Sequence, residues 1–354
     1  MSAAFKIGKH DVFHGAPPLF LPDIGTFFNQ NMSVAVQMVD ELAQAGVSAI
    51  KGEILHTAEI CLPDSGDEAF WGHLSGAVKT EKYRALIERK IVPLNSYEKL
   101  FRHCSELGMD VVVSVYDFDG AAFAKAIGIT ALKIASSSIT HQPLIEYVAG
   151  LGLPVILDTG HSTIEEIGRA VDWARDAGTE NLIIQHSPLP PPHSVSLHNL
   201  RFMNTLGIAM GLPYGLSDHH DGDEMVYAAA AMGAVVIEKG VRPNDIGDDQ
   251  DAAHALPVSQ VGVVVRKIRN VHTAMGSGIR QLPRDRHKYH SRMGLVAKRE
   301  LTAGEFISLE NVTFAFPARG IEVEYWREVV GGVLSRDVGA GEVIQWKDVC
   351  DFPR

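Results

Sequence analysis

Thr130–Ser138, with the sequence TALKIASSS, places a single lysine, Lys133, in an otherwise apolar run that ends in four small residues. The apolar residues around Lys133 predict a buried strand. A buried charge is costly unless an opposite charge or a ligand pairs with it, so Lys133 belongs either to a functional site or to a structural ion pair. The stretch alone leaves both interpretations open.

The same layout recurs from Leu19 to about residue 275. Seven further apolar runs end near a polar residue, and these residues are Asp23, Lys51, Ser114, Asp158, His186, Asp218 and Glu238. Glycines such as Gly108 and Gly207 precede most of the runs, as expected where a helix ends in a glycine and leads into a buried parallel strand. Residues 162–165 predict a capping box that opens one of the helices. Eight such units predict a (β/α)8 TIM barrel; an open doubly wound sheet is the alternative.

One long segment interrupts the regular pattern, and the pattern stops where the predicted barrel ends. The segment from about residue 56 to 94 is too long for an ordinary loop, so we expect it to cover the barrel mouth or to contain an extra helix. The barrel is predicted over residues 1–276, a linker over 277–290, and a small β-rich domain over 291–354. Two similar phrases, AKRELTAGEFISLENV and LSRDVGAGEVIQWKDV, indicate that the small domain is built from two related halves.

Composition excludes several classes of protein. The formal net charge of −11 argues against a nucleic-acid-binding protein, because phosphate contacts need a basic face. No apolar run reaches the length of a membrane span and the N-terminus lacks a secretory signal, so we expect a cytoplasmic protein without membrane contact. The three cysteines are far apart and odd in number, which predicts reduced thiols.

The polar residues at the strand ends predict the site. In a TIM barrel the active site lies at the carboxyl ends of the strands. Two lysines, Lys51 and Lys133, with the hydroxyls of Ser114 and Ser136, suit a phosphate or carboxylate group. Carboxylates and histidines at the same mouth suit a divalent metal or acid–base chemistry. The alternative for any one of these residues is a structural ion pair inside the barrel.

Several stretches together resemble the sialic acid synthase family. The order and spacing of ALKIASSSIT, LPVILDTGHSTIEEI, YGLSDH and LVAKRELTAGEFISLENV are similar to those of this family. Its members condense phosphoenolpyruvate with an N-acetylated hexosamine to give a 2-keto-3-deoxy acid and phosphate. Their TIM barrel is followed by a small antifreeze-like (SAF) domain. The resemblance covers nearly the whole chain, and it implies the same two domains here.

The resemblance also implies roles for individual residues. Phosphoenolpyruvate-binding positions correspond to Lys51, Ser114, Lys133 and Ser136. Asp23 takes the place of a glutamate that handles a proton, and His219 falls on a metal-binding histidine. The implied cofactor is Mn²⁺ or Mg²⁺, and the implied assembly is a domain-exchanged homodimer. The residues expected on the side of the sugar-like aldehyde are Glu53, Asp251 and Arg319.

The departures from the family pattern predict a different acceptor or different chemistry. Gly240 stands where the family has a second metal histidine, and either His186 or Glu238 is a candidate to replace it. Ser138 replaces a glutamate, and Asp158 replaces a serine, so an acid would face the phosphate unless a lysine or a metal neutralises it. Glu53 replaces a glutamine at an acceptor-side position.

We therefore expect a carbon–carbon bond-forming synthase that uses phosphoenolpyruvate and a sugar aldehyde, with catalytic residues Asp23, Lys51, Lys133 and His219. One alternative is a Schiff-base aldolase in which Lys133 or Lys51 is the nucleophile. Another is a catalytically degenerate relative that binds a sugar.

Overall fold

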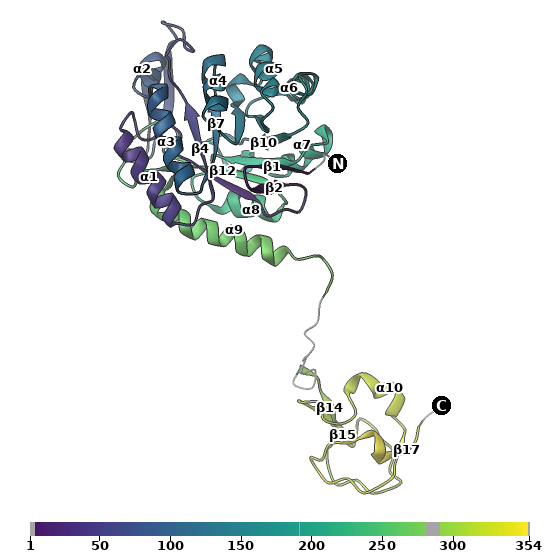
Figure 1. Cartoon of the computed structure of the whole chain (residues 1–354). Helices are drawn as coiled ribbons and strands as arrows, with labels where there is room; N and C mark the ends of the chain where they lie inside the picture. The colour runs from purple at the N-terminus through teal and green to yellow at the C-terminus, as the bar shows by residue number, and fades with distance from the viewer. Residues whose placement is uncertain (1–3, 191, 281–290, 353–354) are drawn as a thin grey trace. The chain divides into compact units, whose positions relative to one another are not determined.

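The computed structural model describes residues 4–190, 192–280 and 291–352 (Figure 1). The chain forms two compact units, Met1–Ser277 and Gly278–Arg354. Residues 281–290 of the linker expected at 277–290 lie outside the described residues.

The first unit is a closed parallel barrel with helices around it, which confirms the predicted TIM barrel (Figure 1). Neighbouring strands pair in parallel from β11 through β10, β9, β8, β7, β4 and β3 to β12, and β11 also pairs with β12 to close the ring. Each strand contains one of the predicted apolar runs. The strands are β3 (Leu19–Asp23), β4 (Ala49–Ile54), β7 (Asp110–Val115), β8 (Ala131–Ile134), β9 (Val155–Asp158), β10 (Leu182–His186), β11 (Tyr214–Asp218) and β12 (Val236–Arg242).

Helices follow the strands and lie outside the ring (Figure 1). They are α1 (Met32–Gln44), α3 (Leu94–Glu106), α4 (Phe118–Ala126), α5 (Gln142–Gly150), α6 (Ile164–Asp176), α7 (Arg201–Met210), α8 (Glu224–Ala231) and α9 (Val261–Met275). No helix in the described part of the chain is long and apolar enough to cross a membrane.

Two local predictions about helix ends are wrong. Gly207 lies inside α7, which ends at Gly211 in the left-handed conformation. A Cβ on Gly207 would lie 2.2 Å from Cδ1 of Tyr214, so this glycine permits close packing of helix on strand. The capping box is shifted by one residue from the expected 162–165: Thr163 caps α6 and accepts a hydrogen bond from the backbone N–H of Glu166.

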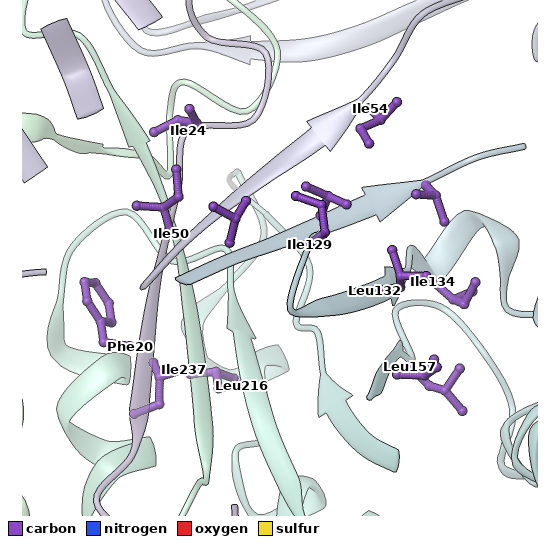
Figure 2. Packing of buried hydrophobic residues seen from close by; sticks show 14 of the residues in the cluster. Phe20, Ile24, Ile50, Ile54, Ile129, Leu132, Ile134, Leu157, Leu216 and Ile237 are labelled. Atoms are coloured by element: carbon purple, nitrogen blue, oxygen red, sulfur yellow. The ribbon is translucent and has the colours of Figure 1, made fainter. Parts of the chain in front are cut away.

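Strand side chains alternate between two faces, as the pleat requires. Outward side chains form a large apolar cluster with the helices, and Figure 2 shows part of it, including Phe20, Ile50, Leu132, Leu157, Leu216 and Ile237. Inward apolar residues near the amino ends of the strands, such as Leu21, Val112 and Ile156, form a second cluster with Ile7 and Val12. The latter two belong to a hairpin of β1 (Phe5–Ile7) and β2 (His10–Val12). The inward positions at the carboxyl ends are polar.

The long segment between β4 and α3 contains an antiparallel hairpin of β5 (Asp67–Gly72) and β6 (Ala77–Lys82), followed by the extra helix α2 (Tyr83–Glu88). It is tied to the loop after β12. The backbone N–H of Leu74 donates to Asp248 at 2.7 Å, and Arg89 pairs with Asp249 at 2.7 Å. These contacts hold the loop that leads to Asp251.

The second unit has its own apolar core and two small antiparallel sheets, β14 (Gly294–Ala297) with β15 (Val312–Ala315) and β16 (Val333–Leu334) with β17 (Val349–Asp351). It also contains the short helix α10 (Trp326–Val329). The two similar phrases form equivalent turns, because Arg299 pairs with Glu305 at 2.8 Å and Arg336 with Glu342 at 2.7 Å. A bridge between Leu301 and Val338 joins the halves.

Candidate active site

A polar cavity of about 140 Å³ lies at the carboxyl ends of the barrel strands. Neighbouring strands bring their polar residues into register, with Asp23 beside Lys51 and Ser114 beside Lys133. The sequence-predicted residues that line this cavity are Asp23, Lys51, Glu53, Ser114, Lys133, Ser136, His219 and Asp251.

Lys51 is buried and is paired with three carboxylates. Its Nζ lies 2.6 Å from Asp23, 3.2 Å from Glu53 and 3.5 Å from Glu238. Burial alone would lower the pKa of Lys51, but the carboxylates outweigh this effect and raise it well above its ordinary value. Burial and the neighbouring acids raise the pKa of Asp23 to about 7, although Lys51 favours its ionised form. Asp23 can therefore gain or lose a proton near neutral pH.

Lys133 is held by two buried acids. Its Nζ donates to both oxygens of Glu238, each at 2.7 Å, and lies 2.7 Å from Asp158. Burial opposes the charge on Lys133, yet Asp158 and Glu238 raise its pKa. Burial likewise opposes ionisation of Glu238, but Lys133 and Lys51 lower its pKa to about 2. The ion pair that the sequence left as one alternative thus exists, and it lies inside the candidate site.

Two serines lie beside these lysines. Ser114 is 1% exposed, and its hydroxyl has no hydrogen-bond partner among the described residues. An unsatisfied buried hydroxyl is unfavourable, so it is typical of a position that a ligand completes. Ser136 begins the turn Ser136–Ser138 after β8 and lines the cavity. A Cβ on Gly160, whose φ is +28°, would lie 2.3 Å from Cβ of Ser136.

A pair of histidines forms another wall of the cavity. The rings of His219 and His254 lie 4.7 Å apart between centroids, at an angle of 71°. Nδ1 of His219 lies 3.3 Å from the hydroxyl of Ser187. Burial, with His219 and Lys239 nearby, lowers the pKa of His254 well below its ordinary value, so its ring is neutral.

Sequence reasoning missed His254 and also Lys90, which lines the cavity and is buried. Lys90 ends the long segment after β4, and its Nζ lies 3.3 Å from Asp249. The length of that segment was a signal that it reaches the barrel mouth, but nothing in its pattern distinguished Lys90 from a surface lysine.

Two of the predicted residues lie elsewhere. The side chain of His186 is buried outside the cavity lining, where its Nε2 lies 2.7 Å from the carbonyl oxygen of His198 and its ring packs against Phe202. Arg319 is exposed on the second unit, in the loop between β15 and α10.

A larger, mostly apolar hollow of about 760 Å³ lies at the amino ends of the strands, lined by Phe13, Ile208 and Tyr214 among others. It brings no lysine or carboxylate together, so the polar cavity is the candidate for chemistry.

Comparison with known proteins agrees with this geometry. Residues 38–280 match the NeuB family model, and residues 292–349 match the SAF domain. The chain belongs to the NeuB family. Named relatives are synthases, so this membership makes the chain a member of a family of carbon–carbon bond-forming enzymes.

Among curated relatives, an N,N'-diacetyllegionaminic acid synthase of Campylobacter jejuni is 25% identical over 92% of this chain and 98% of its own length. An uncharacterized protein of Methanocaldococcus jannaschii is 29% identical over 97% of this chain and 98% of its own. The crystal structure of a sialic acid synthetase of Leptospira borgpetersenii, 23% identical, superposes with a TM-score of 0.69 and covers 80% of this chain and 94% of its own. That likeness shows the same fold.

Two histidines of the cavity, and no larger group of ligands among the described residues, are the residues that would hold a divalent metal. No group of three or more His, Cys, Asp or Glu side chains with metal-binding geometry occurs within the described ranges. The imidazoles of His219 and His254 nevertheless face the same cavity, together with the Asp251 carboxylate. These two imidazoles would hold a cation whose other positions water or substrate oxygens would fill, since divalent metals in enzymes commonly keep open positions.

Proposed function

We propose that this NeuB-family chain condenses phosphoenolpyruvate with a sugar aldehyde of the N-acetylhexosamine type. C3 of phosphoenolpyruvate would attack the aldehyde carbon, water would add at C2, and phosphate would leave. The product would be a 2-keto-3-deoxy acid of the nonulosonic type. Arg319 of a domain-exchanged homodimer is part of the proposal, because the family resemblance implies it, and the cytoplasmic location expected from the sequence stays a prediction.

The observation that carries this proposal is the unsatisfied hydroxyl of Ser114 beside Lys133 and Lys51. A buried donor without a partner, in the same cavity as two ammonium groups, offers hydrogen bonds and charge to a phosphate or carboxylate oxygen. Ser136 adds a second hydroxyl at the same wall of the cavity.

Asp23 is suited to proton transfer in this reaction. A carboxyl group with a pKa of about 7 holds or releases a proton at neutral pH, which is the range in which a general acid or base is most effective. His219 and His254 are the residues that would hold a divalent cation. When bound, such a cation would polarise the aldehyde.

The test compares Ser114→Ala with wild type. Phosphate release from phosphoenolpyruvate is measured with a panel of aldoses and N-acetylhexosamines, with MnCl2 present. We expect S114A to raise KM for phosphoenolpyruvate about tenfold, the size of one lost hydrogen bond to a charged group. It should leave the free energy of unfolding unchanged or slightly higher, because the mutation removes an unsatisfied group.

Ser137→Ala serves as the matched control, because Ser137 is an exposed neighbour of Ser136. Loss of stability in S114A without a change in KM would show a structural serine and contradict the proposal. No phosphate release by wild type with any aldehyde would refute the synthase reaction. Tight phosphoenolpyruvate binding in that case would instead support the degenerate relative.

The Schiff-base alternative conflicts with the electrostatics. A lysine nucleophile must be neutral to attack a carbonyl, which requires a lowered pKa. The acids around Lys51 and Lys133 raise the pKa of both ammonium groups.

A further inference from the structure

We propose that His254 acts with His219 as a two-histidine site for a first-row divalent cation, in a chain whose position 240 is glycine. This inference deepens the proposed function, because the cation would sit in the cavity assigned to the aldehyde. His254 lies in the loop that follows β12.

His254 lies in the wall of the polar cavity. The residue is 4% exposed. The polar contact that the structure gives its ring is an approach of Nε2 to Asp251 Oδ1 at 3.9 Å, which is too long for a hydrogen bond. Within the described residues, the imidazole therefore has no hydrogen-bond partner, and its nitrogens are not fully closed off from the cavity. Its neighbour across the cavity is the ring of His219 at 4.7 Å.

Gly240 lies close to Ala255, the residue that follows His254. A Cβ at position 240 would lie 3.3 Å from Cβ and 3.5 Å from Cα of Ala255. A side chain at position 240 would therefore pack directly against Ala255, which would have to shift by a few tenths of an ångström. This chain has glycine at position 240 and histidine at position 254.

Contacts on both sides hold the loop that carries His254 in place. β13 (Leu256–Pro257) pairs in parallel with Val241 and Arg242 of β12, which fixes the chain directly after His254. On the other side, Asp249 is held by Arg89 and Lys90 of the long segment. A loop anchored at both ends presents its imidazole at a defined position, as a ligand must be.

The chemistry of the pair favours a transition metal. Imidazole nitrogen suits Zn²⁺, Fe²⁺ and Ni²⁺, whereas Mg²⁺ prefers oxygen ligands; affinity for such nitrogen sites rises from Mn²⁺ toward Cu²⁺. The hydroxyl of Ser187 can accept the Nδ1 proton of His219, and a metal-binding histidine commonly has its second nitrogen held in this way. The remaining positions would be taken by water or by oxygens of the aldehyde substrate.

The experiment measures MnCl2 binding to the full chain after treatment with a chelator, without any substrate. Electron paramagnetic resonance gives the free Mn²⁺, and the nitrogen modulation of the bound signal counts imidazole ligands. We expect one Mn²⁺ per chain with two imidazoles. His254→Gln and His219→Gln should each weaken binding at least tenfold and leave one imidazole. His272→Gln, which changes a histidine of α9, is the control and should bind as wild type does.

Unfolding curves of each variant separate a lost ligand from a lost fold, and a second variant, G240H/H254Q, restores an imidazole from the other position. Unchanged Mn²⁺ binding in a folded H254Q, or loss of binding in His186→Gln instead, would overturn the inference. Turnover that persists without any bound Mn²⁺ would also overturn it and would leave the proposed function intact. Mn²⁺ binding as expected with no turnover would refute the proposed function alone.

Discussion

Asp158→Asn should tighten the binding of phosphoenolpyruvate. Asp158 lies 2.7 Å from Nζ of Lys133, the ammonium group that we assign to the phosphate or carboxylate of the ligand. The asparagine keeps the size of the side chain and removes its negative charge. Lys133 keeps both oxygens of Glu238 as partners, so the variant should still fold.

The magnitude follows from the separation of the charges. A ligand oxygen that shares the ammonium of Lys133 with Asp158 would lie roughly 5 Å from that carboxylate, where two unit negative charges repel by about 3 kcal/mol at an effective dielectric constant of about 20. Part of this is lost to screening at the open mouth of the cavity. A gain of about 1.4 to 3 kcal/mol corresponds to a Kd that is about 10- to 100-fold lower.

Isothermal titration calorimetry with phosphoenolpyruvate alone measures this Kd without any turnover. Asp172→Asn is the matched control, because Asp172 is exposed on α6, the helix that follows β9. D172N should bind as wild type does. An unchanged or higher Kd in a folded D158N would refute the reasoning, because it would mean that Asp158 does not face the bound anion.

Three further outcomes are expected. Because the pKa of Asp23 is raised from 3.8 to about 7, the folded chain keeps a proton that the unfolded chain has lost, so stability falls as pH rises through this window. Asp23→Asn should remove that contribution, and urea unfolding at about pH 5 and about pH 8 measures it. Lys239→Met leaves the fully buried Asp218 without its ammonium and should cost about 3–5 kcal/mol, whereas D218N/K239M should cost less in the same unfolding assay. After treatment of the protein with pyruvate and borohydride, mass spectrometry should detect no adduct on Lys51 or Lys133. An adduct on either lysine would support the Schiff-base mechanism instead.

The barrel and most of the cavity could be predicted because each strand carries a short apolar run that ends in a polar residue. In β8, Lys133 interrupts apolar neighbours, so its burial and its special role are visible in the sequence. The position of Lys51 in β4 is visible for the same reason. In the structure both lysines point into the barrel, because the outward positions of these strands pack against the helices.

The direction of His186 could not be predicted in this way. In the run LIIQHS both Ile183 and Ile184 are apolar, so the sequence does not show which face of β10 is inward. In the structure Ile183 belongs to the inner cluster and Ile184 to the outer one, which points Gln185 inward and His186 outward. In a strand that is buried on both faces, both sets of alternating residues are apolar, so the sequence does not show which set points into the barrel.

His254 could not be predicted because its place depends on contacts between distant segments. It follows β12 by many residues in a loop without periodicity, and Arg89 and Lys90 hold that loop through Asp249. Gly240 alone suggested a lost ligand. Only the structure shows that another histidine, His254, lies in the cavity beside His219.

The charge balance of the cavity connects the two proposals. Six acids line the cavity with three lysines, so acids exceed lysines by three; the acids are Asp23, Glu53, Asp158, Asp218, Glu238 and Asp251, and the lysines are Lys51, Lys90 and Lys133. The excess falls toward two where Asp23 holds its proton. Such a cavity attracts cations more readily than a ligand with both a phosphate and a carboxylate.

A divalent cation between the rings of His219 and His254 would offset most of this excess, because it adds two positive charges beside the same carboxylates. Mn²⁺ should therefore tighten phosphoenolpyruvate binding. By thermodynamic linkage, phosphoenolpyruvate must tighten Mn²⁺ binding by the same factor. Titrating each ligand in the presence of the other measures that factor twice. Two independent ligands, with a factor of about one, would mean that the carboxylates are neutralised by protons and not by the metal.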